Sequence, residues 1–189
     1  MQQPKKFRHH PGGPRPEEHF TLLIDPQHLQ ERVVELASQI EADMAGLDPV
    51  LVVILKGGIL FGVDLLRAMK QPWPVVFLPR RPPKTPDWIT LEDQKLLHGR
   101  NLVVVDGILD DGNSLSLLLQ RLQFLAPASV RLGVLLHRTV SHALPLPITW
   151  VGFEVPHLRV TGYGLDEGER FRGLPGIFTW IETHSTENG

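Results

Sequence analysis

The sequence predicts one α/β domain in which a mostly parallel central sheet is flanked by helices on both faces. Apolar runs at 49–55, 102–106 and 130–136 have the composition of strands that are buried on both faces of a sheet. Helical patterns at 59–69 and 114–125 lie between these runs. Strands that alternate with helices pair in parallel, because each helix carries the chain back across the sheet. The 189 residues are enough for one such domain with its own core.

The chain begins with a basic segment that we predict to be a flexible tail. Residues 1–19 combine closely spaced prolines and glycines with a cluster of lysine and arginine. Prolines and glycines at this density sustain neither helix nor strand. The basic charges could contact RNA or a partner, but a solvated tail is the simpler interpretation. We therefore place the folded domain at 20–189.

The first predicted helix starts at Asp25 and Pro26, a cap residue followed by proline at the first helical position. Its apolar positions follow the spacing i, i+4, i+7 and i+11 and form one face: Leu29, Val33, Leu36 and Ile40. Gly46 ends this helix. The apolar strand 49–55 comes next, and the glycine-containing turn after it leads into the helix 59–69.

A proline-rich segment follows the short predicted strand 75–78. Residues 79–99 show little periodicity, and we predict a loop of about 12 residues and then a short turn, long enough to form a lid over a site. The last predicted strands, 148–155 and 159–164, fall within a small hood built around 148–180.

The composition argues against several classes of function. A formal net charge of −2 and a pI near 6.5 give no general attraction to nucleic acid or to an anionic membrane. The sequence contains no cysteine, which leaves no disulfide framework and fits a reducing cytoplasm. We expect a cytoplasmic protein without a signal peptide or membrane span, because no apolar stretch approaches the roughly 18 residues of a spanning helix.

The segment 101–115 is the most informative part of the sequence. An apolar run ends in Asp106, a short loop carries two further aspartates and a glycine, and a leucine-rich helix begins near Ser114. A buried strand that leads through a glycine turn to a helix N-terminus forms a site for a phosphate, because free backbone N–H groups point at the ligand. The carboxylates beside it suit sugar hydroxyls and a divalent metal.

Three parts of the chain together resemble the bacterial-type hypoxanthine-guanine phosphoribosyltransferase family. The first part is LVVILKGG at 51–58 with DLLR at 64–67, and the second is the segment 102–115. The third consists of VGFEVP at 151–156, TGYGLD at 161–166, RFR at 170–172 and LP at 174–175. Their order and spacing are those of the family over about 20–180. The resemblance implies a type I phosphoribosyltransferase fold. It also implies purine salvage: transfer of a 5-phosphoribosyl group from phosphoribosyl pyrophosphate to hypoxanthine or guanine, with Mg²⁺ and with release of pyrophosphate.

The resemblance also implies roles for individual residues. Asp110 would be the catalytic proton acceptor for the purine nitrogen. A larger group would bind the phosphate, the ribose and the pyrophosphate: Lys56, Gly57, Asp106, Asp111, Gly112, Asn113, Ser114 and Arg172. The purine would lie against Arg159, Val160 and Asp166. Mg²⁺ would be held by Asp106 and Asp166.

Several positions depart from the family pattern. Gly107 stands where the family has a second carboxylate, and Asp111 stands where it usually has a threonine that contacts the 5-phosphate. The segment 79–90 is short and lacks the Ser-Tyr pair of the family lid. Arg159 replaces an aromatic residue that stacks on the purine, and Pro147 stands where some members have a purine-reading lysine. We expect Gly107→Asp and Asp111→Thr each to strengthen the binding of phosphoribosyl pyrophosphate.

Two functions remain open at this point. The chain is either a working purine phosphoribosyltransferase or a poorly active homologue that binds a nucleotide or phosphoribosyl pyrophosphate as a regulator or partner subunit. Locally, Asp110 could be a plain helix cap, Lys56 part of an ordinary turn, and Asp166 with Arg172 a solvated ion pair. An RNA-binding regulator would need a basic face, which the net charge of −2 does not favour. We also expect a homo-oligomer, either a dimer or a tetramer.

Overall fold

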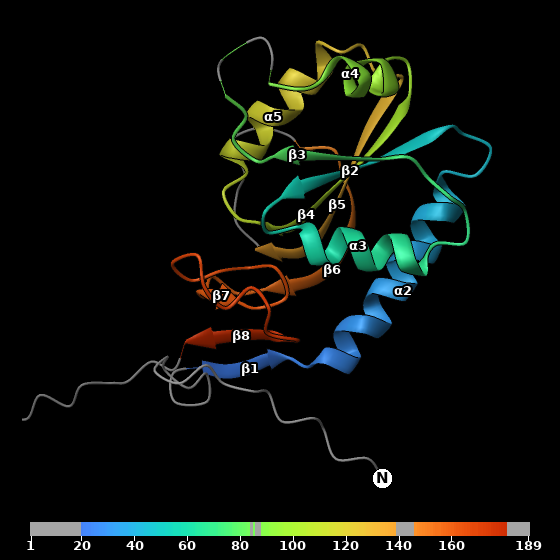
Figure 1. Ribbon diagram of the computed structural model, residues 1–189. Coiled ribbons are helices and arrows are strands. Elements are labelled where there is room, and N and C mark those ends of the chain that lie inside the picture. Colours follow the sequence, from blue (N-terminus) through green and yellow to red (C-terminus); the bar gives the residue numbers. More distant parts are fainter. Residues whose placement is uncertain (1–19, 84, 86–87, 139–145, 181–189) are drawn as a thin grey trace, which may run out of the picture.

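The computed structural model describes residues 20–83, 85, 88–138 and 146–180 (Figure 1). The predicted basic tail, 1–19, lies outside these residues. Within the described ranges, no helix is both long enough and apolar enough to cross a membrane.

A five-stranded sheet forms the centre of the molecule, with the strand order β3-β2-β4-β5-β6. Each neighbouring pair of strands is parallel. The strands are β2 (Pro49–Leu55), β3 (Val75–Pro79), β4 (Asn101–Leu109), β5 (Ser129–Arg138) and β6 (Ile148–Val155). The most apolar of the predicted strands, β2 and β4, lie inside the sheet, as their composition requires. The predicted α/β fold with a parallel central sheet is therefore confirmed.

Helices cover both faces of this sheet. On one face lie α2 (Pro26–Asp43) and α3 (Ile59–Ala68), and on the other lie α4 (Leu91–Leu97) and α5 (Asn113–Gln123). Alternate residues along β2 and β4 belong to two separate hydrophobic cores, because successive side chains of a strand point to opposite faces.

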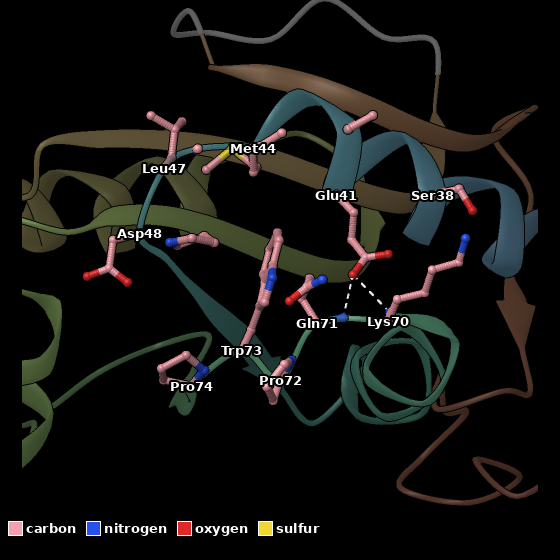
Figure 2. Close-up of a pocket in the computed structure, with 14 residues that line it drawn as sticks. Ser38, Glu41, Met44, Leu47, Asp48, Lys70, Gln71, Pro72, Trp73 and Pro74 are labelled. Carbon is pink, nitrogen blue, oxygen red and sulfur yellow. Dashed lines mark hydrogen bonds between the residues drawn. The ribbon is translucent and has the colours of Figure 1, made fainter.

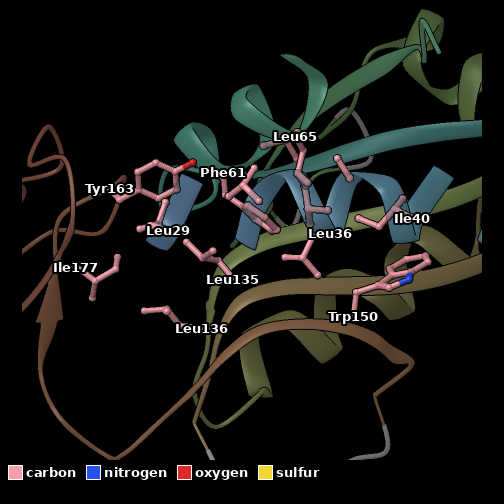
Figure 3. Close-up of a cluster of buried hydrophobic side chains, with 14 of the residues drawn as sticks. Leu29, Leu36, Ile40, Phe61, Leu65, Leu135, Leu136, Trp150, Tyr163 and Ile177 are labelled. Carbon is pink, nitrogen blue, oxygen red and sulfur yellow. The ribbon is translucent and has the colours of Figure 1, made fainter. Parts of the chain in front are cut away.

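The core beneath α2 and α3 also anchors the hood. Figure 3 shows Leu36 of α2 and Phe61 of α3 in one cluster, which Tyr163 and Ile177 of the hood also join. The Tyr163 hydroxyl donates a hydrogen bond of 2.7 Å to the Asp64 carboxylate of α3. Burial and this bond raise the pKa of the Tyr163 phenol. The hood is thus fixed to the main body by packing and by a polar contact.

Three short strands form the hood as a separate antiparallel sheet with the order β1-β8-β7. They are β1 (Phe20–Ile24), β7 (Val160–Thr161) and β8 (Ile177–Trp180). β1 and β8 come from opposite ends of the described chain and lie side by side (Figure 1). The rings of Phe20 and Trp180 pack edge to face across this pair, with 4.8 Å between their centroids.

Three details differ from the sequence-based expectations. The predicted hood bounds, 148–180, include β6, which lies in the main sheet, and leave out β1. The predicted loop 79–99 contains α4, whose N-cap Thr90 accepts a hydrogen bond of 3.1 Å from the Asp93 backbone N–H. Prolines earlier in that segment masked this short helix, although threonine followed by acidic residues is a common helix start.

Adjacent valines on α2 provide a test of this core. Val33 is fully buried, whereas Val34 is 47% exposed. Val33→Ala should lower the free energy of unfolding by roughly 2–3 kcal/mol, because it removes buried methyl groups and leaves a cavity. Val34→Ala should change it by less than about 0.5 kcal/mol. Chemical denaturation measures both, and equal losses would contradict the placement of this helix face.

Candidate active site

A cleft of about 830 Å³ opens at the carboxyl ends of the parallel strands, opposite the hood loop 162–172. Ligands bind at this end of open α/β sheets, because the loops after the strands converge there. Charged side chains from several separate segments line the cleft: Lys56, Arg80, Asp110, Arg138, Asp166 and Arg172. Residues far apart in the sequence therefore meet in one polar site.

A second hollow, of about 680 Å³, lies at the amino ends of β2 and β3 (Figure 2). Its floor includes Trp73, and the Glu41 carboxylate accepts bonds of 2.8 and 2.7 Å from the backbone N–H groups of Lys70 and Gln71. None of the residues predicted for the site lines this hollow. The cleft at the carboxyl ends is therefore the candidate active site.

The loop between β4 and α5 has the form expected of an anion site. Gly112 has a left-handed backbone (φ 78°) and is the N-cap residue of α5, so the chain turns from strand to helix within a few residues. The Asp111 carboxylate accepts bonds of 3.0 Å each from the backbone N–H and the side-chain amide of Asn113. These bonds are the main reason why the pKa of Asp111 is lowered. An ionised side chain of the loop itself thus occupies one N–H group of the predicted phosphate cradle.

Asp106, at the centre of the sheet, is paired with an arginine that had no predicted role. Its side chain is 1% exposed, and one oxygen accepts a 2.7 Å bond from the Gly107 N–H. The other oxygen lies 3.5 Å from Arg80 Nη1 and has no hydrogen-bond partner among the described residues. Burial raises the pKa of Asp106 to about 6, although Arg80 opposes this shift. Arg80 also contacts the Ser114 hydroxyl (3.0 Å) and the Ile108 carbonyl (3.2 Å), and so spans both ends of the loop.

The close packing around Gly107 argues against the expectation that Gly107→Asp strengthens binding. A Cβ atom at position 107 would lie 2.5 Å from the carbonyl oxygen of Gly57 and 3.1 Å from the Leu165 side chain. A contact of 2.5 Å with a backbone atom forces the turn at 56–58 to move. Glycine is therefore required here because two backbone segments approach closely, and a second carboxylate cannot simply be added.

Asp110 is held by an arginine at the end of β5. Arg138 Nη1 donates a 2.6 Å bond to the Asp110 carboxylate, and Nη2 donates to the Leu158 carbonyl. His157 Nδ1 lies 3.8 Å from the other carboxylate oxygen. Because Gly112 rather than Asp110 is the N-cap of α5, Asp110 is not a plain helix cap. Its carboxylate is positioned over the cleft by a guanidinium that is largely buried.

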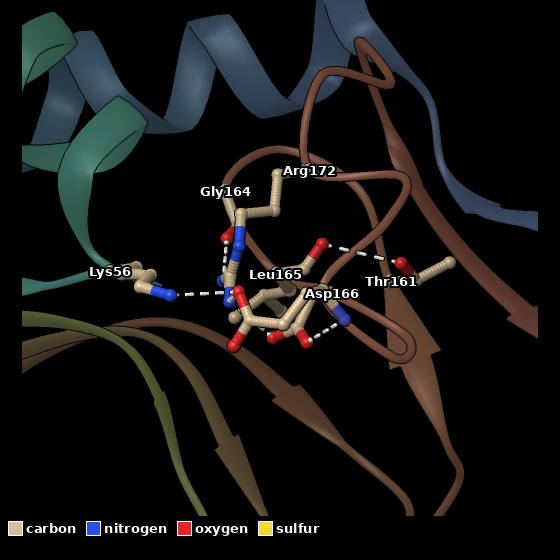
Figure 4. A network of polar contacts seen from close by, with 7 residues as sticks. Lys56, Thr161, Gly164, Leu165, Asp166 and Arg172 are labelled. Atoms are coloured by element: carbon tan, nitrogen blue, oxygen red, sulfur yellow. Dashed lines mark hydrogen bonds and ion pairs between the residues drawn. The ribbon is translucent and has the colours of Figure 1, made fainter.

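The predicted pyrophosphate-binding cations meet at one carboxylate, that of Glu169. Figure 4 shows Lys56, Asp166 and Arg172 gathered in this network. Lys56 follows β2 after a cis peptide bond, and its Nζ lies 2.9 Å from Glu169 Oε2. Arg172 Nη2 lies 3.0 Å from the same oxygen and 2.9 Å from Asp166 Oδ1. The bonds from Lys56 and then from Arg172 lower the pKa of Glu169. Asp166 and Arg172 are therefore part of a wider network than the simple ion pair considered from the sequence.

The segment predicted to face the purine is divided between two places. Val160 lines the cleft. Arg159 lies instead on the outer side of the hood, where its guanidinium sits 5.4 Å from the centre of the Trp180 ring and pairs with Glu167. The ring contact and the ion pair explain this position, and the cleft in the described structure is not lined by Arg159.

Most predicted site residues therefore lie on or beside one cleft. Those that line it are Lys56, Gly57, Asp110, Asp111, Ser114, Val160, Asp166 and Arg172. Gly112 and Asn113 belong to the same loop, and Asp106 is buried at its base. Four further charged residues line the cleft and had no predicted role: Arg80, Arg81, Arg138 and Glu169. Arg80 directly follows β3, and Arg138 is the last residue of β5. These positions at the carboxyl ends of parallel strands are the sequence signal that could have identified both residues.

Known proteins share both the sequence and the fold of this chain. A model of the phosphoribosyl transferase domain family matches residues 24–168. Hypoxanthine-guanine phosphoribosyltransferase of Mycobacterium tuberculosis is 33% identical over 171 residues, which cover 84% of this chain and 85% of that protein. Hypoxanthine phosphoribosyltransferase of Salmonella typhimurium is 31% identical over 165 residues, which cover 82% of this chain and 92% of that protein.

A solved structure of a hypoxanthine-guanine phosphoribosyltransferase from Bacillus anthracis superimposes with a TM-score of 0.75 at 30% identity, over 86% of this chain and 99% of that chain. The fold, the strand-to-helix loop and the family match agree, so the resemblance read from the motifs is confirmed. The chain belongs to the phosphoribosyl transferase domain family.

Proposed function

We propose that the protein is a purine phosphoribosyltransferase that moves a 5-phosphoribosyl group from phosphoribosyl pyrophosphate to a hypoxanthine- or guanine-type base and releases pyrophosphate. The observation that carries this proposal is the meeting of Lys56, Asp110, Asp166 and Arg172 on one cleft, although they come from distant parts of the sequence. The family relatives named above support the reaction class. A poorly active regulator or partner subunit has less support, because Lys56, Asp110, Asp166 and Arg172 are retained on the cleft, although the second carboxylate of the family is replaced by Gly107.

The leaving pyrophosphate gains negative charge as its bond to the ribose breaks. Lys56 and Arg172 present cations toward the cleft from opposite walls, one after β2 and the other in the hood. Fixed cations stabilise charge that develops during a reaction, because they need little reorganisation at that moment. We propose that these two residues bind the pyrophosphate group, with Gly57 beside them in the same turn.

Asp110 is proposed to accept the proton that the purine nitrogen loses when it bonds to the ribose. The Asp110 carboxylate lies on the cleft, and Val160 lines the same space. Arg138 holds one carboxylate oxygen at 2.6 Å, so the other oxygen is oriented for the base. Such a fixed carboxylate is suited to act as a general base.

The 5-phosphate is proposed to bind at the start of α5. Backbone N–H groups at a helix N-terminus attract an anion, and the Ser114 hydroxyl adds a donor there. The Asn113 N–H is at present bonded to Asp111, so the Asp111 carboxylate must turn away when a phosphate uses that group.

Mg²⁺ fits this site through Asp166 more readily than through Asp106. Asp106 is buried and paired with Arg80, and among the described residues no cluster of three or more His, Asp or Glu side chains could hold a metal by itself. Asp166 lies on the cleft surface. We propose that Asp166 holds Mg²⁺ together with oxygens of the substrate, where the ion would add positive charge beside the leaving group.

The remaining proposals concern the protein as a whole. We propose a single domain from residue 20 onward that acts in the cytoplasm as a homo-oligomer. The lack of cysteine fits that reducing compartment. The direct test of the function is to mix the purified protein with phosphoribosyl pyrophosphate, Mg²⁺ and each of several purine bases, and to measure pyrophosphate release. Absence of release with every base would overturn the proposal.

Asp110→Asn should lower kcat about 100-fold or more, because a general base typically contributes that much. Binding of phosphoribosyl pyrophosphate should persist, since the pyrophosphate contacts lie elsewhere in the cleft. Steady-state kinetics and calorimetry measure the two effects. Asp48→Asn is the matched control, because Asp48 lies at the opposite end of the sheet and pairs with Arg100. Unchanged turnover in Asp110→Asn would remove this residue from the mechanism.

Arg138→Met should lower kcat about 10- to 100-fold, because it removes a hydrogen bond to a charged group that orients the general base. Combining it with Asp110→Asn should cost little more than Asp110→Asn alone, since the two residues act as a unit. Arg131→Met on the same strand removes a bond to the Asp43 carbonyl instead and should leave kcat unchanged. Additive losses in the double variant would show that Arg138 acts independently of Asp110.

Asp111→Thr should strengthen the binding of phosphoribosyl pyrophosphate about fivefold, which corresponds to removing one charge about 4 Å from the phosphate in water-like surroundings. The change also frees the Asn113 N–H for the phosphate. Isothermal titration calorimetry with Mg²⁺ measures the affinity. Weaker binding would mean that the Asp111 cap is needed to hold the loop in shape.

A further inference from the structure

Glu169 joins the two cations that we assign to the pyrophosphate group. Its Oε2 atom lies 2.9 Å from Lys56 Nζ and 3.0 Å from Arg172 Nη2. A single oxygen therefore sits between two positive charges, on a cleft that is built to take an anionic group. This is the position that an oxygen of a bound pyrophosphate would take.

Arg172 does not depend on Glu169 for its orientation. Its Nη1 donates a 2.8 Å bond to the Gly164 carbonyl, and its Nη2 also pairs with Asp166 at 2.9 Å. These contacts remain when the Glu169 side chain moves away. The guanidinium is thus also held in place by groups other than Glu169.

The Glu169 side chain is free to leave, whereas its backbone is held. The side chains of Lys56 and Glu169 are 67% and 65% exposed, so their ion pair is weak and water can replace it. The Glu169 N–H donates a 2.8 Å bond to Asp166, and Glu167 and Arg170 are joined by backbone hydrogen bonds on either side of it. A rotation of the side chain is enough to open the site.

We infer that Glu169 is an internal competitor for the pyrophosphate position: its carboxylate bridges Lys56 and Arg172 in the free protein and is displaced when the pyrophosphate group binds. This inference rests on the proposed function. A pyrophosphate carries more negative charge than one carboxylate and can bond both cations at once. It therefore displaces the Glu169 carboxylate from the two cations when it binds. After the product has left, the carboxylate returns to both cations.

The competing explanation, a purely structural role, predicts the opposite sign. If Glu169 served to position the two cations, its removal would weaken anion binding. If it competes with the anion, its removal strengthens binding. Glu169→Gln keeps the size and the backbone demands of the residue, which has a φ of 64°, and removes only the charge.

The test is calorimetric titration of the protein with inorganic pyrophosphate in the presence of Mg²⁺. Glu169→Gln should bind about three- to tenfold more tightly than the unmodified protein, the range expected when two ion pairs of an exposed carboxylate no longer have to be broken. Glu35→Gln is the matched control, because this exposed glutamate also pairs with an arginine but lies on α2 outside the cleft. The affinity of the Glu35→Gln protein for pyrophosphate should equal that of the unmodified protein. Glu169→Ala should repeat the gain. In kinetic assays, Glu169→Gln should lower KM for phosphoribosyl pyrophosphate and make inhibition by pyrophosphate stronger.

The outcomes separate this inference from the proposed function. Equal or weaker pyrophosphate binding by both Glu169 variants, with clear binding by the unmodified protein, overturns the competitor role and leaves the transferase proposal in place. No binding by any of the proteins overturns the assignment of the pyrophosphate site itself. Tighter binding by both variants, with an unchanged Glu35→Gln protein, supports the inference.

Discussion

The central position of β4 determines where every other part of the site lies. This strand pairs with β2 on one side and β5 on the other, and its apolar residues belong to the cores on both faces. Asp106 lies on this strand in the interior of the protein, and the strand ends at Leu109, where the phosphate loop begins. Because the strand cannot shift without disturbing both cores, the loop and α5 begin at a fixed point. The residues of β2, β5 and the hood are placed relative to that point.

Around this point, the carboxylates of the cleft are held by arginines from separate elements. Arg80 follows β3, Arg138 ends β5, and Arg172 lies in the hood, and each of them pairs with a different aspartate. Guanidinium groups suit this task because they present several donors in a fixed plane. The cleft thereby keeps its carboxylates oriented before any ligand enters, and the charges that a phosphate-bearing substrate meets are already in place.

The sequence was sufficient where local pattern decides structure. The apolar runs of β2 and β4 and the cap at Asp25 identified the strands and the first helix. The resemblance of the turns after the strands to the family motifs indicated Lys56 and Asp110. Pairing between distant residues was not visible, so Arg138 and Glu169 were missed although both touch predicted residues. Position 107 is a further case of a contact that the sequence does not reveal. A small residue is needed there because the turn at Gly57, fifty residues earlier in the chain, lies against it. β1 and β8 were missed because strands of only five and four residues carry little pattern.

The pairing of β1 with β8 has a consequence for how the protein acquires its site during synthesis. The main sheet consists of strands that follow one another at moderate distances, so it can assemble as the chain leaves the ribosome. The hood, in contrast, joins the first strand of the described chain to the last one. Contacts between such distant segments form late, because closing a long loop loses chain entropy before the contacts at its ends can compensate for that loss. Asp166 and Arg172 lie between β7 and β8, so the newly made chain acquires its complete cleft only after β8 has been synthesised and has paired with β1.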